Sequence, residues 1–519
     1  MKRAHPTFVL ALLFFFVAIE AATSEPGGMP TPKVGGAVIT VNPQPKFELS
    51  PYLYMQFMEP LGATDGSIEA AWDHQTEDWR SDLVDVTKEI APPMMRWGGC
   101  ISSYYRWKEA VGPRDQRVPM QNLLWGGIES NQIGTREFVD FCKRVGAESL
   151  ICVNFESDGR NNWAHPRKGG ERLAGPEEAA EWVDYCNNPN NALRKQHGVT
   201  NSCGVRFWQI GNETNYGYGH QGYGFDCETA AQKTLLFAKA MRKADPTIQL
   251  IGWGDYGPGK SGWAKRMLEV AGGELQYLAF HHMFDAGPPL RKNDFRKDPA
   301  RTWDALMNAC RIHEQKILKM RKEIAGSSVP LALTECHMAL PGRNRCEVLS
   351  SWAAGVANAR LANLHERHGD VLKIATLADY CGTRWLVNAV IIPTPAGKSF
   401  QMPVARIMSL YRKHSGKQAV EVVETAPGLD VTASRTGSHI FLHVVNTDRT
   451  QPVSVELSIA GMSIKRGSVF EIAAEPEFEV LEYEDKLAAK QKELSKDCKW
   501  TFPPASVSAI ELDADEVNK

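Results

Sequence analysis

The sequence has almost no excess of charge of either sign. Its 519 residues include 59 Lys and Arg against 61 Asp and Glu, a formal net charge of −2, and the pI is near 6.7. It also has no run of like charges that would indicate a binding tail. A nucleic-acid-binding domain usually has a pI above about 9. The composition therefore argues against that class and favours a small or uncharged partner.

Long apolar runs are scarce beyond the N-terminus. Lys2 and Arg3 precede an apolar stretch from Phe8 to Ile19, and small residues follow it. This order is typical of a secretory signal peptide, and the stretch is shorter than the roughly 20 apolar residues that span a bilayer. We expect residues 1–22 to be a signal peptide, the mature chain to be secreted or periplasmic, and the membrane not to be a partner.

Evidence for a metal site is also scarce. None of the 11 cysteines has CxxC spacing, and the odd count leaves at least one thiol unpaired in an exported chain. The sequence permits disulfides but does not say which cysteines pair. The adjacent His281 and His282 would point to opposite faces of a strand, so at most one could join a site that needs three or more ligands. We expect no metal and no cofactor.

Short apolar, β-rich runs alternate with longer amphipathic segments between residues 51 and 395. This alternation is the pattern of βαβ units, and eight units over about 350 residues fit a (β/α)₈ TIM barrel, an α/β fold, with insertions. The expected strands are Leu53–Glu59, Met94–Trp97, Ser149–Phe155, Phe207–Glu213, Gln249–Gly252, Tyr277–His281, Leu331–Glu335 and Leu372–Leu377. The expected helices include Gly134–Val145, Ala179–Cys186, Cys227–Lys243, Ala305–Ala325 and Ser350–His368.

The pattern changes after the barrel, and residues 396–519 are expected to form a C-terminal antiparallel β-sandwich. Residues 23–50 begin as a Gly/Pro-rich linker and end with Ala37–Asn42, a run that we expect to add a strand to the same sandwich. The charge-rich segment Glu482–Lys496 is expected to be a helical insertion. The expected sandwich strands are Val420–Thr425, Leu429–Ser434, His439–Asn446, Val453–Leu457 and Ser468–Ile472.

Two of the expected barrel strands, the fourth and the seventh, end in a carboxylate, at Glu213 and Glu335. Functional groups of TIM barrels gather at the C-terminal ends of the strands. Glycoside hydrolysis needs one protonated and one ionised carboxyl group on either side of the scissile bond, and crowding and burial separate the two pKa values. We therefore predict that Glu213 and Glu335 are the catalytic pair. Their separation, which distinguishes retention from inversion, is not given by sequence.

Several motifs resemble glycoside hydrolase family 51, the clan A family of α-L-arabinofuranosidases and some endoglucanases. They are the first-strand run Gln56–Gly62, the second-strand run Arg96–Gly99 and the fourth-strand run Trp208–Glu213. The resemblance covers most of the barrel and extends into the sandwich. It implies a retaining mechanism with Glu213 as acid/base and Glu335 as nucleophile.

The same resemblance implies roles around the catalytic pair. Glu59 would hold the sugar in the glycone subsite, and Asn212 would bind a substrate hydroxyl. Arg96 is expected to hold the substrate or the carboxylates, and His281 to position the nucleophile or a substrate hydroxyl. The loop after the acid/base, Tyr216–Gly224, has tyrosines that could stack on a sugar ring.

The chain departs from the family at four positions around the glycone. Cys100 stands where the family has Asn, Met283 where it has Tyr, Cys336 where it has Trp, and Asp379 where it has Gln. A site that hydrogen-bonds particular hydroxyls discriminates strongly against sugars that lack them. We therefore expect Cys100, Met283 and Asp379 to contact the substrate and to alter the sugar that is accepted.

The sequence thus predicts a retaining glycoside hydrolase, exo-acting and α-L-arabinofuranosidase-like, acting on a polysaccharide or oligosaccharide. The alternatives are an endo-acting β-glucanase or xylanase of the same clan, a catalytically inert carbohydrate-binding barrel, and a metal-dependent hydrolase. The expected partner is a carbohydrate and not a nucleic acid. The sugar, the linkage, exo or endo action and the oligomeric state, homo-oligomers included, are left open by the sequence.

Overall fold

A computed structural model describes residues 37–60, 67–122, 127–156, 172–215, 225–257, 260–286, 297–339, 347–480 and 486–516. The predicted signal peptide, the linker up to residue 36 and the Tyr216–Gly224 loop lie outside these residues. No helix within the described ranges is long and apolar enough to cross a membrane.

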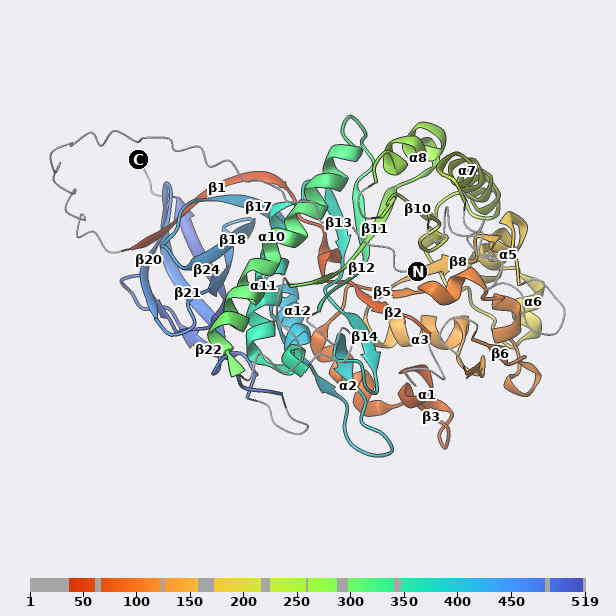
Figure 1. Cartoon of the computed structure of the whole chain (residues 1–519), viewed down its shortest axis with the longest axis horizontal. Coiled ribbons are helices and arrows are strands. Elements are labelled where there is room, and N and C mark those ends of the chain that lie inside the picture. The colour runs from red at the N-terminus through yellow and green to blue at the C-terminus, as the bar shows by residue number, and fades with distance from the viewer. Residues whose placement is uncertain are drawn as a thin grey trace, which may run out of the picture. The chain divides into compact units, whose positions relative to one another are not determined.

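A parallel sheet forms the first part of the fold (Figure 1). Eight of its strands are hydrogen-bonded to one another in chain order: β2 (Gln56–Met58), β5 (Met94–Trp97), β8 (Glu148–Val153), β9 (Phe207–Ile210), β10 (Gln249–Trp253), β11 (Tyr277–Asp285), β12 (Leu331–Ala339) and β13 (Leu372–Ala375). All eight predicted strands and the α/β class are confirmed. The first strand starts later than predicted, since Pro51–Tyr54 forms the 3₁₀ helix η1. β11 and β12 continue past their predicted ends, to Asp285 and Ala339.

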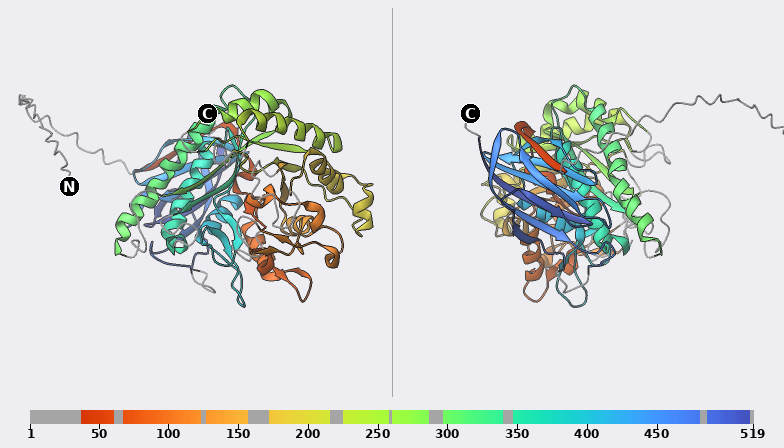
Figure 2. Two further views of the ribbon diagram at one scale, coloured as in Figure 1. Left: turned by 45° about the vertical axis from the view of Figure 1, so that its right-hand side comes forward. Right: turned by 90° about the vertical axis from the view of Figure 1, so that its left-hand side faces the viewer.

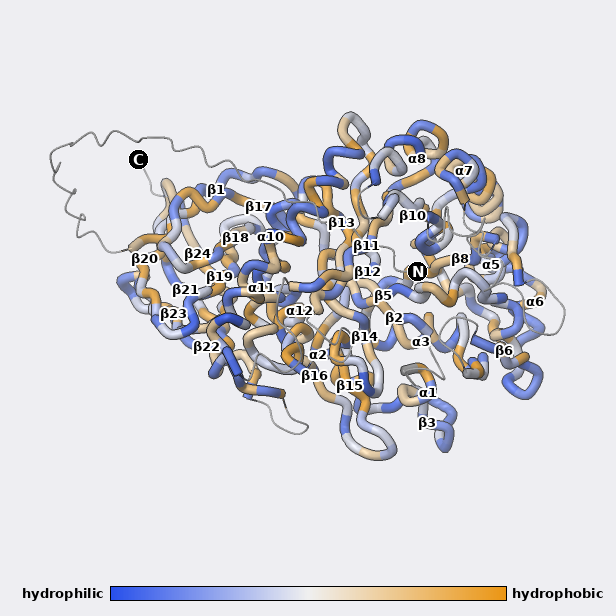
Figure 3. Tube along the Cα trace, in the orientation of Figure 1, coloured by the Kyte–Doolittle hydropathy of each residue, from blue (hydrophilic) through white to orange (hydrophobic). Residues whose placement is uncertain are grey.

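Helices connect these strands, as βαβ units require. They are α2 (Ser81–Ile90), α3 (Thr135–Val145), α5 (Pro176–Asn187), α7 (Cys227–Ala244), α8 (Trp263–Ala271), α10 (Pro299–Glu323) and α11 (Trp352–Arg367). Their sequences define their ends: α5 and α10 begin with proline, and the N-cap Asp226 of α7 accepts a hydrogen bond from the Thr229 amide at 2.8 Å. Figure 3 shows hydrophilic and hydrophobic residues alternating along α7 and α8, as expected for helices that cover a sheet.

Shorter helices and hairpins lie in the segments that connect these strands and helices. They are α1 (Ser67–Ala71), α6 (Ala192–Gln196), the hairpin β3 (Trp72–Asp73) and β4 (Asp78–Trp79), the hairpin β6 (Met120–Gln121) and β7 (Ile128–Glu129), and the 3₁₀ helices η2 (Cys100–Ser103), η3 (Trp107–Ala110), η4 (Arg114–Gln116), η6 (Gly272–Glu274) and η8 (Glu347–Ser350).

The chain between residues 372 and 382 contacts both ends of this run of strands. β13 pairs with β12, and after a break of three residues β14 (Asp379–Gly382) pairs with β2, where Asp379 lies opposite Phe57. The Met55 amide also donates to the Ala375 carbonyl at 2.9 Å. The sheet continues through β15 (Asn388–Ile391) and β16 (Phe400–Gln401), and α12 (Pro403–Lys413) then packs against α2 and α11.

A second sheet, the C-terminal sheet, surrounds a separate apolar core. Its strands are β1 (Val38–Glu48), β17 (Gln418–Glu424), β18 (Leu429–Thr436), β19 (His439–Asn446), β20 (Val453–Ile459), β21 (Met462–Ala473), β22 (Lys490–Glu493), β23 (Lys499–Phe502) and β24 (Ser506–Glu516). Neighbouring strands are antiparallel except β1 and β20. The predicted contribution of Ala37–Asn42 is confirmed, since β1 (red) lies among the blue C-terminal strands in Figure 2.

The predicted helix at Glu482–Lys496 is wrong over its described part. Residues 490–493 form the edge strand β22, which pairs with β21. All four residues of β22 are exposed, and its Lys, Gln, Lys and Glu side chains are of the charged and polar kind that protects a sheet edge from pairing with another chain. The same composition is common in exposed helices, so it does not discriminate between the two.

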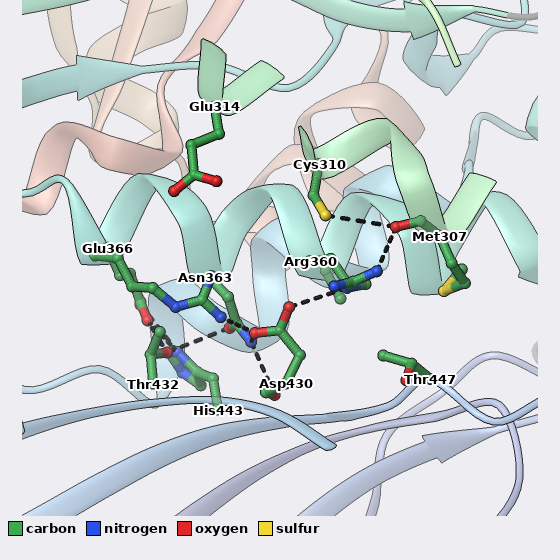
Figure 4. A network of polar contacts seen from close by, with 12 residues as sticks. Met307, Cys310, Glu314, Arg360, Asn363, Glu366, Asp430, Thr432, His443 and Thr447 are labelled. Carbon is green, nitrogen blue, oxygen red and sulfur yellow. Dashed lines mark hydrogen bonds and ion pairs between the residues drawn. The ribbon is translucent and has the colours of Figure 1, made fainter. Parts of the chain in front are cut away.

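Polar side chains on α11 hold the C-terminal sheet (Figure 4). Arg360 and Asn363 bond to Asp430 of β18, with the Arg360 Nε and Asp430 Oδ2 atoms 2.9 Å apart. Glu366 accepts from Thr432 and lies 2.9 Å from His443 Nδ1. Burial alone would raise the pKa of Glu366, but His443 and the hydrogen bonds from Thr432 and Tyr54 outweigh it and lower this pKa. The contact is therefore built around a buried carboxylate anion.

We expect Glu366→Gln to destabilise the fold by about 2 kcal/mol near neutral pH, because it removes one partner of a buried charge pair. A lowered carboxyl pKa stabilises the fold above the unfolded value of about 4.3 and ceases to do so as the pH falls below it. The difference in the free energy of unfolding between wild type and Glu366→Gln should therefore become smaller as the pH falls. Urea unfolding at pH 7 and pH 3.5 measures both effects.

Glu421→Gln is the matched control, since the Glu421 pair with Lys46 is exposed and should contribute less than about 0.5 kcal/mol. Equal losses in the two variants would contradict a special role for Glu366.

Candidate active site

A buried arginine joins three strands at the C-terminal edge of the parallel sheet. Arg96, in β5, is fully buried. Its Nη1 donates to Glu335 Oε1 at 2.9 Å, its Nη2 to Asn212 Oδ1 at 2.7 Å and its Nε to Gln209 Oε1 at 3.0 Å. Arg96 therefore positions the two predicted catalytic strand ends relative to each other.

The chain turns sharply where β9 ends. Gly211 has a φ of 75° and Glu213 a φ of 50°, so both lie in the left-handed region. A side chain at Gly211 would come within 2.7 Å of Thr214 Cγ2. A glutamate in this conformation costs of the order of 1–3 kcal/mol, a strain that places its carboxyl group at the sheet edge.

His281 bridges the two catalytic candidates. Its Nδ1 lies 3.0 Å from Glu213 Oε1 and 3.6 Å from Glu335 Oε2, and its Nε2 lies 3.0 Å from Thr334 Oγ1. One oxygen of each glutamate and a nitrogen of His281 are all within 4.8 Å of one another. The Trp253 ring packs edge-on against His281, with centroids 4.5 Å apart. The predicted pair is thus brought together, with an imidazole between the two carboxylates.

Glu59 completes the acidic cluster from the end of β2. Its Oε1 accepts from the Ile101 amide at 3.1 Å. Gly99, with a φ of 107°, leaves the space that this carboxyl group fills, since a Cβ there would lie 2.5 Å from Glu59 Cδ. Burial, followed by the charge of Glu335, raises the pKa of Glu59 well above its usual range. Burial and the neighbouring carboxylate therefore favour the protonated form of Glu59 more than water would.

Opposing effects act on Glu335. Burial and the nearby Glu213 carboxylate raise its pKa, while His281 and Arg96 lower it, and the net direction is upward. Arg96 and His281 are the groups that favour the anion. A substrate that separates Glu213 from Glu335 would remove the carboxylate repulsion and leave Glu335 more acidic.

Two of the four positions that depart from the family lie near these carboxylates. The Cys100 thiol donates to Glu213 Oε2 at 3.9 Å, and Asp379 Oδ1 lies 3.4 Å from His337 Nδ1. Met283 is paired in register with His337. Cys336 is fully buried, and burial raises the pKa of its thiol. Cys100 and Asp379 therefore reach the acidic cluster, whereas Met283 is located only by its register.

Sequence reasoning missed three residues of this cluster. Gln209 and Thr334 anchor Arg96 and His281. His337 is buried, contacts Asp379, and its Nε2 has no hydrogen-bond partner among the described residues. Strand alternation could have found His337, because it lies two positions after Glu335 and hence on the same face. Nothing in the sequence indicated that Gln209 and Thr334 support the site.

His282 points away from the acidic cluster, as the alternation predicted. Its Nδ1 lies 2.7 Å from His313 Nδ1, and His313 Nε2 lies 2.8 Å from His365 Nε2. This histidine chain links β11 to α10 and α11. Burial, then the charge of Lys316, lowers the pKa of His282 to about 4, and burial lowers that of His365 to about 3. The chain is therefore built from neutral imidazoles.

We expect acid to destabilise the fold through this chain. The pKa of His282 is near 6.5 when unfolded and about 4 when folded. The unfolded state therefore binds more protons as the pH falls from 6.5 to 4, and stability is lost over that window. His282→Gln should remove roughly 2 kcal/mol of this pH dependence. Unfolding curves between pH 7 and 4 measure it.

His439→Gln serves as the control, because His439 is exposed at the C-terminal sheet. An equal change of the free energy of unfolding with pH in wild type and in His282→Gln would show that the three histidines are not the groups that titrate.

Comparison with known proteins shows which enzymes this chain is similar to. Residues 86–300 match the family model described as the alpha-L-arabinofuranosidase 1 domain. The chain is 32% identical over 229 residues to alpha-L-arabinofuranosidase C of Emericella nidulans, covering 42% of each chain. It is 30% identical over 253 residues to the intracellular exo-alpha-(1->5)-L-arabinofuranosidase of Acetivibrio thermocellus, covering 46% of each. The matches thus span less than half the length of these relatives.

The fold is shared over a longer range. The structure of the family 51 alpha-L-arabinofuranosidase of Thermotoga petrophila superposes with a TM-score of 0.74, covering 92% of this chain and all of that one at 24% identity. The resemblance that the sequence motifs predicted is confirmed by these comparisons taken together.

Proposed function

We propose, from its confirmed resemblance to glycoside hydrolase family 51, that this chain is a retaining, exo-acting α-L-arabinofuranosidase-like glycoside hydrolase. The observation that carries the proposal is the pair of carboxylates Glu213 and Glu335, which have oxygens within 4.8 Å of each other and of His281. Retaining glycosidases hold their two carboxyl groups about 5–5.5 Å apart, whereas inverting ones need about 6.5–9.5 Å. The observed separation favours retention.

In the first step, Glu213 protonates the glycosidic oxygen while Glu335 attacks the anomeric carbon and forms a glycosyl ester. In the second, Glu213 takes a proton from water while the water oxygen attacks the anomeric carbon and displaces Glu335 as a carboxylate, so the sugar leaves with its original anomeric configuration. Arg96 stabilises the Glu335 anion, and His281, held by Thr334, keeps both carboxylates oriented.

The glycone would be held by side chains in and beside the acidic cluster. Asn212, whose Nδ2 is buried without a described partner, can donate a hydrogen bond to a sugar hydroxyl, and the Glu59 carboxyl group can bond to another. Asp379 and His337 supply a carboxylate and an imidazole where the family resemblance implies a neutral Gln near the sugar. This change supports a sugar specificity that differs from that of the family. Arabinofuranose is the first sugar to test.

We propose the finer architecture on the same basis. β13 and β14 would together form the eighth strand of a closed (β/α)₈ barrel, since they pair with β12 and β2 respectively. The C-terminal sheet would be the predicted β-sandwich. Residues 1–22 support export of the chain, which amino-terminal sequencing of secreted protein would test.

We expect wild-type protein to hydrolyse an aryl α-L-arabinofuranoside with retention, and Glu335→Gln to lose at least about 10⁴-fold in kcat because no nucleophile is left. The anomer of the first-formed product is read by NMR. Glu314→Gln, on the exposed surface of α10, should retain full activity.

Surviving turnover in Glu335→Gln would disprove the mechanism. Loss of wild-type activity with a chelator would favour the metal-dependent alternative, since Glu213, His281 and Glu335 are close enough to bind a cation. An endo-acting enzyme would instead cleave internally linked oligosaccharides, and an inert carbohydrate-binding barrel would turn over none of these substrates.

We expect Glu213→Gln to depend on the leaving group. An aryl glycoside whose phenol leaves without protonation needs no general acid for the first step, so the glycosyl ester should accumulate and give a burst of phenol. A poorly leaving alcohol should react at least about 10²-fold more slowly than in wild type. Stopped-flow measurement of phenol release shows the burst. Equal losses on both substrates would contradict the acid/base assignment.

A further inference from the structure

Two cysteines, Cys186 and Cys203, face each other beside α5, in the stretch of chain that precedes Glu213. Cys186 lies in the last turn of α5, and Cys203 in the segment that leads into β9. Both thiols are free and both residues are buried, but Cys203 is 8% exposed whereas Cys186 is not exposed at all. A disulfide partner could therefore approach Cys203 first.

A backbone hydrogen bond holds the two cysteines next to each other. The Cys203 amide donates to the Cys186 carbonyl at 2.6 Å, and standard bond lengths then keep the two Cα atoms within about 6.8 Å of each other. The Asn187 side chain accepts from the Val205 amide and donates to the Val205 carbonyl, both at 2.8 Å. Disulfides join Cα atoms about 4.4–6.8 Å apart, so the backbone places this pair within the upper limit of that range.

The surroundings make Cys203 the reactive member. The Cys186 thiol donates a hydrogen bond to the Cys203 sulfur, which, with the charges of Lys143 and Arg194, lowers the pKa of Cys203 to about 7. The guanidinium of Arg194 is fully buried, and its Nε and Nη2 have no hydrogen-bond partner among the described residues. By contrast, burial raises the pKa of Cys142 well above its usual range. A thiolate is the attacking form in disulfide exchange.

We propose that Cys186 and Cys203 are a redox site that forms an internal disulfide by exchange with a small-molecule or protein disulfide. The Cys203 thiolate attacks one sulfur of the oxidant and releases one thiolate, leaving a mixed disulfide on Cys203. Cys186 then loses its proton, attacks the Cys203 sulfur and releases the second thiolate. Two protein thiols are oxidised and one disulfide of the oxidant is reduced to two thiols.

The bond would join the end of α5 to the segment that enters β9, the strand that Asn212 and Glu213 follow. It closes a short loop that includes α6, and closing such a loop restricts the unfolded chain more than the folded one. The oxidised form should therefore be the more stable of the two, and exposure to an oxidising compartment would stabilise the strand that presents the acid/base candidate.

The purified full-length chain is incubated with oxidised glutathione, alkylated, denatured and digested with trypsin without reduction. Cleavage after Arg172, Arg194, Lys195 and Arg206 separates the two cysteines into peptides 173–194 and 196–206. We expect mass spectrometry to find these two peptides joined, two fewer free thiols per chain, and a Tm several degrees higher than that of the reduced protein.

Cys203→Ala and Cys186→Ala should each lose the joined peptides and the redox-dependent shift in Tm, while Cys142→Ala, at an equally buried cysteine, should retain both. A variant that fails to fold leaves the peptide map of the wild type as the deciding measurement. The proposal is overturned if the oxidised wild type contains only glutathione adducts, pairs either cysteine with another residue, or shows no joined peptide. None of these outcomes depends on glycosidase activity.

Discussion

The guanidinium of Arg96 is buried where β2, β5, β9 and β12 approach one another, and its hydrogen bonds reach Gln209, Asn212 and Glu335. A buried positive charge is tolerated only when it is paired and its N–H groups are satisfied. The planar fork of arginine can meet three acceptors from different strands at fixed angles, which a lysine ammonium cannot do. Arg96 and Glu335 are thus each the condition for the other's burial. The same contact that makes the sheet edge stable also sets the spacing of the carboxylates.

The contact between α11 and the C-terminal sheet also contains buried charged groups that are paired and hydrogen-bonded. Glu366 and Asp430 are buried carboxylates on opposite sides of the contact, and each bonds to side chains of the other side (Figure 4). Such groups contribute little net stability compared with apolar side chains. Their directional bonds, however, are satisfied in only one relative placement of β18 and α11. We infer that this polar layer fixes the orientation in which the C-terminal sheet packs on the helix.

Periodicity predicted the eight strands because each is a short apolar run bounded by turn residues, and Met94–Trp97 matches to the residue. It placed Glu213 correctly near the end of a strand, since Glu213 follows β9 by three residues. The predicted strand end at Glu335 is wrong, because β12 continues to Ala339. The break between β13 and β14 could not be predicted, because Thr376–Ala378 is as apolar as the strands beside it. The partners of Arg96 depend on side chains that converge from strands far apart in sequence. The edge strand β22 was missed because its Lys and Glu residues serve an exposed strand as readily as an exposed helix.

The hydrogen bonds that link His282, His313 and His365 must all run in the same direction. Each neutral imidazole carries one proton and one lone pair, so His313 must donate to one neighbour and accept from the other. If His313 donates towards His282, His365 donates towards His313; if His282 donates, both links reverse. The three rings therefore have two polarities and no mixed state without a broken hydrogen bond. The tautomer of His282 on β11 therefore determines the tautomer of His365 on α11. His365 is the residue before Glu366.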